Sequence, residues 1–459
     1  MNTAAMQSER KDQRQSYLGL CAAAILVALP VIFFYVMLLR TALNIPYSDD
    51  YHAVLEFTNQ FIQLQGFPAK ASYFLASQHN EYKLYFGQGV VWLQFALLGH
   101  IDFRLLAAIG NGFILLLGIF FWRIFLPEHK DLGRRLALFV PISWLLFQLQ
   151  YIETLNFSMA GLQNLPILVF SFACIYFLLR KTRGALCGAL AFYVLAIASS
   201  GNGFLLFPVA VLVLVLGRRY AHLLSWAAVT GISIGAYAYH YNSHNSGVSY
   251  RRGIFNSLLH LRPAYAISFM GSALGIPFPV AASFVLGGVL CAFFAWMAYR
   301  GYIRRNPLVS CCVLFLLLTA IGVAGIRSEL GVMQSLSSRY TIYSALLLIF
   351  AWIVIVEEFL QHSSVPLLNH SGYLGAVAVA VLFSLSMDAI GWAMIQQRDL
   401  ELVQGMTAFE HRASAHDSSG PLSTRQETLF PGFNPYARIV LQDSIRLGVY
   451  RPPILRYLP

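Results

Sequence analysis

Charged residues are scarce in this chain. Of its 459 residues, 11% are Asp, Glu, Lys or Arg, whereas soluble domains carry about 25%. Hydrophobic residues make up 58%, and many apolar runs reach about 20 residues, the length that crosses a bilayer core. The alternating segments of about ten residues that are typical of a membrane β-barrel are missing. The sequence therefore excludes an ordinary soluble domain and predicts a polytopic, all-α membrane protein.

Cysteine and acidic residues are also few. The six cysteines all lie in apolar runs, and their spacing fits neither a zinc site nor a disulfide framework. Twenty acidic residues against 31 basic ones leave a net charge of +11. The basic residues, however, gather in short turns between apolar runs, as at Arg134 and Arg135, which is the pattern of cytoplasmic loops. We therefore expect membrane topology, and no nucleic-acid partner, to explain the positive charge.

The apolar runs predict about 11 to 13 transmembrane helices within residues 17–395. Residues 1–16 would form a cytoplasmic N-terminal segment. The first run, about 17–43, is long enough to span and lacks a small-residue cleavage site after it, so we expect an anchor rather than a signal peptide. Residue 44 would then emerge on the outer face. The polar tail 396–459 would lie on that face too, in the periplasm, as a small appended subdomain.

The first outer loop, 44–82, contains two amphipathic pieces that we expect to be juxtamembrane helices. An apolar stripe with Leu55, Phe57 and Phe61 would let the first piece lie flat at the interface. The next apolar segment, 83–99, conflicts with the charge rule, because a second crossing would place Arg134 and Arg135 outside. We therefore expect 83–99 to be tilted or only partly inserted. The alternative is a local violation of the charge rule.

Two adjacent carboxylates, Asp49 and Asp50, follow the first span. Neighbouring carboxylates repel each other, which raises one pKa or attracts a cation. Either result suits catalysis, because the pair could supply a general base or oxygen ligands for a divalent cation such as Mg or Mn. The alternative is structural, since Asp50 alone could cap a helix that begins near Tyr51.

Other polar residues gather on the expected outer face. The stretch QHNEYK contains His79, Glu81 and Lys83, and Lys83 could bind a phosphate oxygen, although an ordinary interfacial helix terminus is the alternative. Glu153 lies on a turn between two apolar helices, where structural hydrogen bonding is the alternative. The remaining candidates are Arg251, Arg252, Arg327, Arg339 and Tyr340. Arginine offers bidentate donors to phosphate, so these residues suit a clamp for a phosphate-linked lipid.

This arrangement resembles the GT-C superfamily of integral membrane glycosyltransferases. The likeness lies in Ser48-Asp49-Asp50-Tyr51 after the first span, in Glu153 on the next outer turn and, loosely, in QHNEYK. It covers about residues 15–360 by layout, and a DxD motif is missing at 150–160, which leaves a metal requirement open. The resemblance implies a GT-C-like domain over 17–395 with Asp50 or Asp49 as the catalytic carboxylate. It also implies a polyprenyl-phosphate-linked sugar as donor and inversion at the anomeric carbon.

We therefore expect a glycosyltransferase that moves a sugar from a polyprenyl-phosphate carrier to a glycan or lipid acceptor. It would act at the outer face of a bacterial inner membrane, among membrane lipids that reach it through a lateral groove near 44–82. A polysaccharide polymerase or ligase is one alternative, and it would rely on the outer arginines. A transporter or flippase of a lipid-linked saccharide is another, but mid-span charges and internal repeats typical of transporters are not evident.

Overall fold

The computed structural model describes residues 3–126, 131–242, 262–275, 278–360, 366–415 and 435–453. Within these ranges the chain is helical and has no strand, only isolated bridges at His79–Tyr82 and Ile101–Tyr450. The prediction of an all-α fold is confirmed. Among the described residues, seven helices are long and apolar enough to cross a membrane: Leu18–Thr41, Phe103–Ile124, Ser158–Leu178, Val280–Tyr299, Pro307–Leu330, Ser338–Glu358 and Gly372–Phe409. The protein is an integral multi-pass membrane protein with about seven spans.

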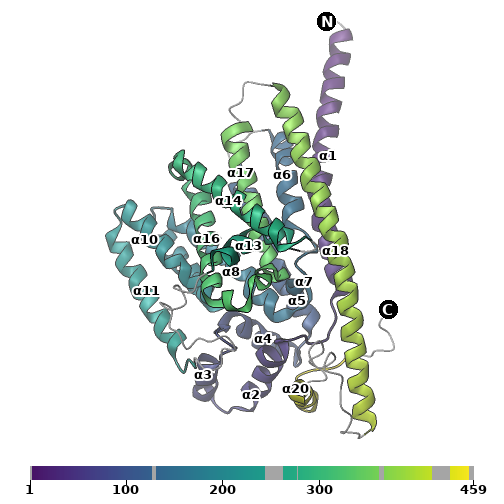
Figure 1. Ribbon diagram of the computed structural model, residues 1–459, viewed down its shortest axis with the longest axis vertical. Coiled ribbons are helices and arrows are strands. Elements are labelled where there is room, and N and C mark those ends of the chain that lie inside the picture. Colours follow the sequence, from purple (N-terminus) through teal and green to yellow (C-terminus); the bar gives the residue numbers. More distant parts are fainter. Residues whose placement is uncertain are drawn as a thin grey trace.

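The elements of the N-terminal half of the chain lie on both sides of the helix bundle in Figure 1, with α1 at the right and α11 at the left. Its elements are α1 (Thr3–Thr41), η1 (Tyr51–Glu56), α2 (Phe57–Gln63), α3 (Phe67–Ala76), α4 (Tyr85–Leu98), α5 (Phe103–Ile124), α6 (Leu132–Leu146), α7 (Ile152–Asn156), α8 (Ser158–Leu178), α9 (Arg183–Ser199), η2 (Gly201–Leu205), α10 (Leu206–Leu216) and α11 (Tyr220–Ala238).

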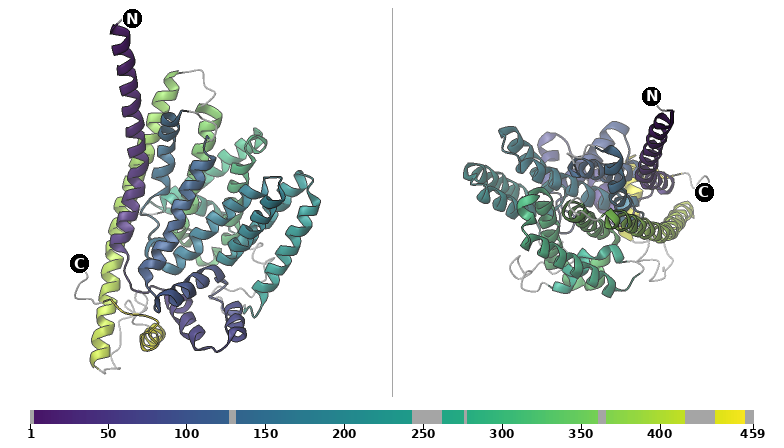
Figure 2. Two further views of the ribbon diagram at one scale, coloured as in Figure 1. Left: turned by 180° about the vertical axis from the view of Figure 1, so that it is seen from behind. Right: turned by 90° about the horizontal axis from the view of Figure 1, so that it is seen from above.

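The C-terminal half completes the bundle. Its elements are α13 (Pro263–Met270), η3 (Ser272–Leu274), α14 (Val280–Tyr299), α15 (Tyr302–Arg305), α16 (Pro307–Arg327), η4 (Ser328–Leu330), η5 (Val332–Leu336), η6 (Ser338–Tyr340), α17 (Thr341–Ile355), η7 (Val356–Leu360), α18 (Pro366–Ala415) and α20 (Pro435–Arg446). The long helices α1 and α18 run beside each other along one edge of the bundle (Figures 1 and 2).

Seven spans are fewer than the 11 to 13 predicted, because several of the predicted segments fold as short helices. α4, α6, α9 and α10 have 14, 15, 17 and 11 residues. At about 1.5 Å per residue, α4 is roughly 21 Å long, which is less than a hydrocarbon core of about 30 Å. This length is consistent with the expectation that residues 83–99 are tilted or only partly inserted, which stays a prediction.

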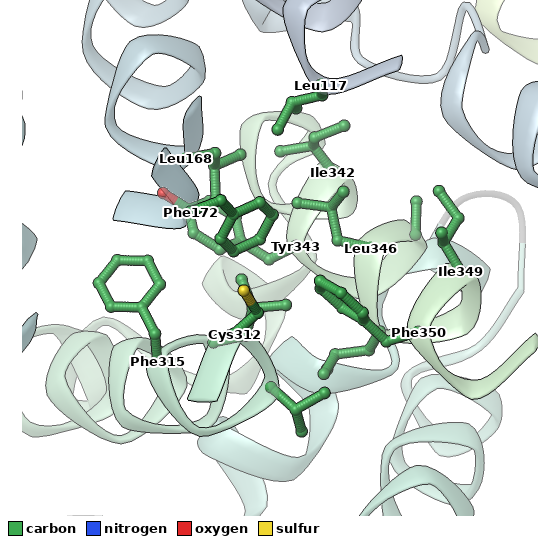
Figure 3. Close-up of a cluster of buried hydrophobic side chains, with 14 of the residues drawn as sticks. Leu117, Leu168, Phe172, Cys312, Phe315, Ile342, Tyr343, Leu346, Ile349 and Phe350 are labelled. Atoms are coloured by element: carbon green, nitrogen blue, oxygen red, sulfur yellow. The ribbon is translucent and has the colours of Figure 1, made fainter. Parts of the chain in front are cut away.

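The centre of the bundle is a dry, aromatic-rich core around α17 (Figure 3). Phe350 on α17 lies 5.5 Å from Phe172 on α8 and 5.3 Å from Phe121 on α5, measured between ring centroids. Cys312 on α16 is fully buried beside them. A helix that is apolar on all sides needs protein around it, and α17 has it, since 83% of its span is buried.

A second, smaller core lies at the end of the molecule away from the N-terminus, beside the lower part of α18 in Figure 1. The predicted stripe residues Leu55, Phe57 and Phe61 are buried there. They pack against Phe409 of α18 and Val440 of α20. The stripe is thus covered by the C-terminal part of the chain, whereas the sequence predicted a helix lying flat in lipid.

The C-terminal segment differs from the predicted tail. α18 continues to Ala415, so the boundary expected at residue 396 falls inside a helix. Further on, the backbone N–H of Ile101 donates to the carbonyl of Val449 at 2.7 Å, and the Tyr450 hydroxyl donates to the carbonyl of Asn44 at 2.5 Å. The C-terminal segment is therefore hydrogen-bonded to the segment that leads from α1 to the acidic motif and holds it in place.

Candidate active site

The acidic motif forms the turn between α1 and η1, and it separates the surroundings of its two carboxylates. Ser48 has a φ of 49°, which is uncommon for a residue other than glycine. Asp50, two residues on, is fully buried. Its Oδ1 accepts the N–H of Met159 at 2.9 Å and its Oδ2 accepts the N–H of Tyr47 at 3.2 Å. Burial raises the pKa of Asp50 to about 7, and the backbone hydrogen bonds only partly oppose that rise.

Asp50 is thus a structural link between the outer loop and the start of α8. It does not cap η1 with its side chain, as the structural alternative had proposed. Both of its oxygens already accept backbone N–H groups, and full burial keeps a substrate hydroxyl away from them.

Asp49 is the accessible carboxylate of the motif, since its side chain is 33% exposed. Its Oδ2 lies 3.3 Å from Nε2 of His79. Burial acts to raise the pKa of Asp49, but the hydrogen bond and charge of His79, together with the charges of Arg339 and Arg327, outweigh burial and lower it. An ionised carboxylate that solvent can reach is what a general base requires.

Two acid–arginine pairs lie close enough to Asp49 for their charges to act on it. Glu81 and Arg327 are joined at 2.5 Å, with 4% and 12% of their side chains exposed. Glu153 lies 3.5 Å from Arg339 and also accepts the hydroxyl of Ser337 at 2.6 Å. The buried Nε of Arg327 has no hydrogen-bond partner, whereas the Nε of Arg339 is the atom that faces Glu153 at 3.5 Å. Arg327 thus keeps a guanidinium donor without an acceptor.

The segments that supply these residues are far apart in the sequence. Glu81 follows the left-handed residue Asn80, whose φ is 50°. Arg327 ends α16, and Arg339 lies in η6 just before α17. Glu153 belongs to α7, and its backbone N–H donates to the hydroxyl of Ser338 at 3.1 Å. The helix ends converge at the same end of the bundle, as the sequence predicted for one polar face.

Lys83 has a different position from the one predicted. Its side chain is fully buried, and Nζ donates to the carbonyls of Leu75, Ala76 and Tyr239, each at 2.9 Å. These carbonyls end α3 and follow α11, where cations are favourable. An ammonium group has three protons to donate, so Lys83 has none left for a phosphate.

The remaining predicted residues divide into two groups. Tyr340 is buried in η6, with its ring 4.9 Å from Phe269 and 5.5 Å from the guanidinium of Arg339. It packs behind the site rather than into it. Arg251 and Arg252 lie outside the residues that the structure describes.

Two residues at the site were missed by the sequence analysis. His52 has its Nδ1 2.6 Å from Nδ1 of His79, and it stands two residues after the acidic pair, where it could have been included. Arg398 is 8% exposed, donates to the carbonyl of Ile152 at 2.9 Å and lies 5.9 Å from the ring of Tyr47. It was assigned to the tail because it follows the last apolar run.

A shared metal ion does not fit Asp49 and Asp50. The oxygens of Asp50 face backbone N–H groups, and Asp49 faces a histidine that is already hydrogen-bonded on its far side. Across the described ranges, no three His, Cys, Asp or Glu side chains are grouped so that they could hold a metal. We therefore do not assign Asp49 and Asp50 as metal ligands and derive no step through an ion.

Comparison with protein-family models, with curated proteins and with solved structures finds no match to this chain. Function must therefore be argued from the site. The site combines an ionised, partly exposed carboxylate with two largely buried arginines whose charges act on it. Such a combination can remove a proton from a hydroxyl and stabilise a phosphate as it leaves.

Proposed function

We propose that the protein is a membrane glycosyltransferase that moves a sugar from a polyprenyl-phosphate carrier to a glycan or lipid acceptor. The observation that carries the proposal is the placement of Asp49. Asp49 is the partly exposed member of the acidic pair and is hydrogen-bonded to His79. Its pKa is lowered by His79 and, in part, by the charges of Arg339 and Arg327.

The proposed reaction is a single displacement. The oxygen of the acceptor hydroxyl attacks the anomeric carbon, and Asp49 takes the hydroxyl proton on its free oxygen. A new glycosidic C–O bond forms while the bond from the anomeric carbon to the phosphate oxygen breaks. The bonding electron pair leaves with the polyprenyl phosphate. Arg327 and Arg339 stabilise the added negative charge through guanidinium donors held in place before the reaction.

The position of the site suits a lipid substrate. It follows directly on α1, whose side chains Leu29, Ile32 and Leu39 are 48%, 60% and 71% exposed. Exposed apolar residues on a spanning helix face lipid, so the prenyl tail could remain in the bilayer while its phosphate reaches the arginines. In a bacterial inner membrane, the proposal places this end of the bundle on the outer face.

Binding of undecaprenyl phosphate tests the proposal without knowledge of the sugar, since this lipid is the common product. We expect the protein in nanodiscs to bind it and Arg339→Gln to bind it at least tenfold more weakly, because one bidentate contact contributes about 1.5–3 kcal/mol. Arg104→Gln is the matched control, because Arg104 lies at the same end, is 59% exposed and pairs with Asp102. Equal binding by all three proteins would contradict the proposal.

Transfer assays with radiolabelled undecaprenyl-phosphate hexoses and pentoses separate the alternatives. The proposed enzyme loses transfer in both Asp49→Asn and Arg339→Gln. A polymerase or ligase that relies on arginine loses it only in Arg339→Gln. A flippase moves a fluorescent lipid-linked saccharide across proteoliposomes and transfers nothing.

A further inference from the structure

A pair of histidines lies directly behind Asp49. His79, which is buried, and His52, which is 44% exposed, face each other with their Nδ1 atoms 2.6 Å apart. The outer nitrogen of His79, Nε2, lies 3.3 Å from Oδ2 of Asp49. The outer nitrogen of His52, Nε2, lies 3.7 Å from Oε2 of Glu56. The four side chains form a row that leads from the site to the surface.

The number of protons on the pair follows from its partners. A carboxylate can only accept, so Asp49 at 3.3 Å favours a proton on Nε2 of His79, and the charge of Glu56 at 3.7 Å favours a proton on Nε2 of His52. The inner nitrogens are at hydrogen-bond distance, so one proton lies between them, and two would clash. The rings therefore hold three protons where two neutral imidazoles hold two. The pair carries one positive charge, between two carboxylates.

Resting on the proposed function, we propose that His52 is a positioning residue for the reaction. It acts through His79, and the two rings share one added proton that keeps the Nε2–H of His79 directed at Asp49. The carboxylate is then held ionised, with Oδ2 occupied and Oδ1 free to take the proton of the acceptor hydroxyl. Neither histidine touches the substrate.

The charged surroundings are consistent with a single added proton. Burial and then the charge of His79 lower the pKa of His52, while Glu56 and Asp49 act to raise it. A second proton on the pair is thus opposed. Arg327 and Arg339 face Asp49 from α16 and η6, and Tyr436 of α20 donates to Glu56.

The amide nitrogen Nδ2 of Asn80 lies 3.0 Å from Nε2 of His79. A protonated Nε2 requires the amide to be turned over, which places the Asn80 oxygen there as an acceptor. As the pH rises, the pair loses its added proton, and Asp49 loses the nearby positive charge.

The test of the pair itself does not depend on activity. Full-length protein labelled with ¹⁵N-histidine is titrated by NMR in nanodiscs, and His52→Phe and His79→Phe assign the signals. We expect one added proton shared by the two rings, with Nε2 of His79 protonated throughout. The proposal would be overturned if the two histidines titrated independently near the ordinary histidine pKa, or if Nε2 of His79 were unprotonated.

The second measurement is the pH profile of sugar transfer. We expect His52→Phe to lower kcat about tenfold with KM unchanged. We also expect the acid limb of the pH profile to move up by about one pH unit, because a tenfold weaker ionisation of the base corresponds to that shift in its pKa. His52→Asn keeps a donor at the Nδ1 position and should restore part of the rate. His100→Gln, at a partly exposed histidine bonded to Leu98, is the control. An unshifted acid limb in His52→Phe would refute the role of His52.

These results are distinguishable from a failure of the proposed function. If the wild-type protein transfers no sugar from any donor, the glycosyltransferase proposal fails, and so does the role of His52 in it. The NMR titration would still decide whether the two rings share a proton.

Discussion

Lys83 gives the sharpest contrast between a structural and a substrate-binding role. Its ammonium is fully buried and donates to three carbonyls at 2.9 Å. Lys83→Met keeps the length of the side chain but leaves these carbonyls without a donor. Hydrogen bonds to a charged group contribute about 1.5–3 kcal/mol each, and the desolvation of the ammonium offsets part of their sum. We expect the free energy of unfolding to fall by about 3–5 kcal/mol.

Unfolding in detergent, followed by tryptophan fluorescence against a rising fraction of SDS, measures this loss. Lys70→Met is the matched control on the neighbouring helix α3, where the ammonium lies 5.5 Å from the ring of Phe61, a contact of about 0.5–1 kcal/mol. If Lys83→Met were as stable as Lys70→Met but failed to bind undecaprenyl phosphate, our assignment of Lys83 would be refuted. The phosphate-binding interpretation would then stand.

Three further predictions concern buried residues that hold the site in place. Burial raises the pKa of Asp50 from 3.8 to about 7. Between these pH values Asp50 is therefore protonated in the folded protein and ionised in the unfolded protein. The stability of the wild type relative to Asp50→Asn should therefore fall as pH rises from 3.8 to about 7, and level off above; thermal unfolding across this range checks it. Arg327→Met leaves Glu81 buried without its cation and should lower the free energy of unfolding by about 3–5 kcal/mol. Adding Glu81→Gln to the same chain should recover part of this loss, and a double-mutant cycle measures the recovery. Tyr450→Phe removes the hydrogen bond to Asn44 and should cost about 1 kcal/mol, with faster hydrogen exchange in residues 44–50 as the readout.

Much of the fold could be predicted because hydropathy is a local property. The apolar runs expected at about 17–43 and 83–99 both fold as helices, in α1 and α4. The count of spans was harder to predict. Short helices such as α4 are apolar enough to resemble spans, and it is their length in the structure, 14 residues for α4, that sets them apart.

The roles of single polar residues could not be predicted in the same way. Asp49 and Asp50 are equivalent by sequence, but a left-handed Ser48 and the nearby start of α8 bury one and expose the other. The partners of Lys83 are carbonyls, which every residue has, so no sequence signal marks them. Arg398 packs against a loop some 350 positions earlier in the chain, and only the tertiary fold brings its side chain to Tyr47.

Sugar transfer by Asp49→Asn, compared with the wild type in the same nanodiscs, tests the central claim most directly. The substitution preserves shape and removes only the basic oxygen. We predict at least about a hundredfold loss of kcat, the usual minimum for a general base, with the unfolding free energy unchanged within about 0.5 kcal/mol. Transfer at the wild-type rate by this variant would contradict the account.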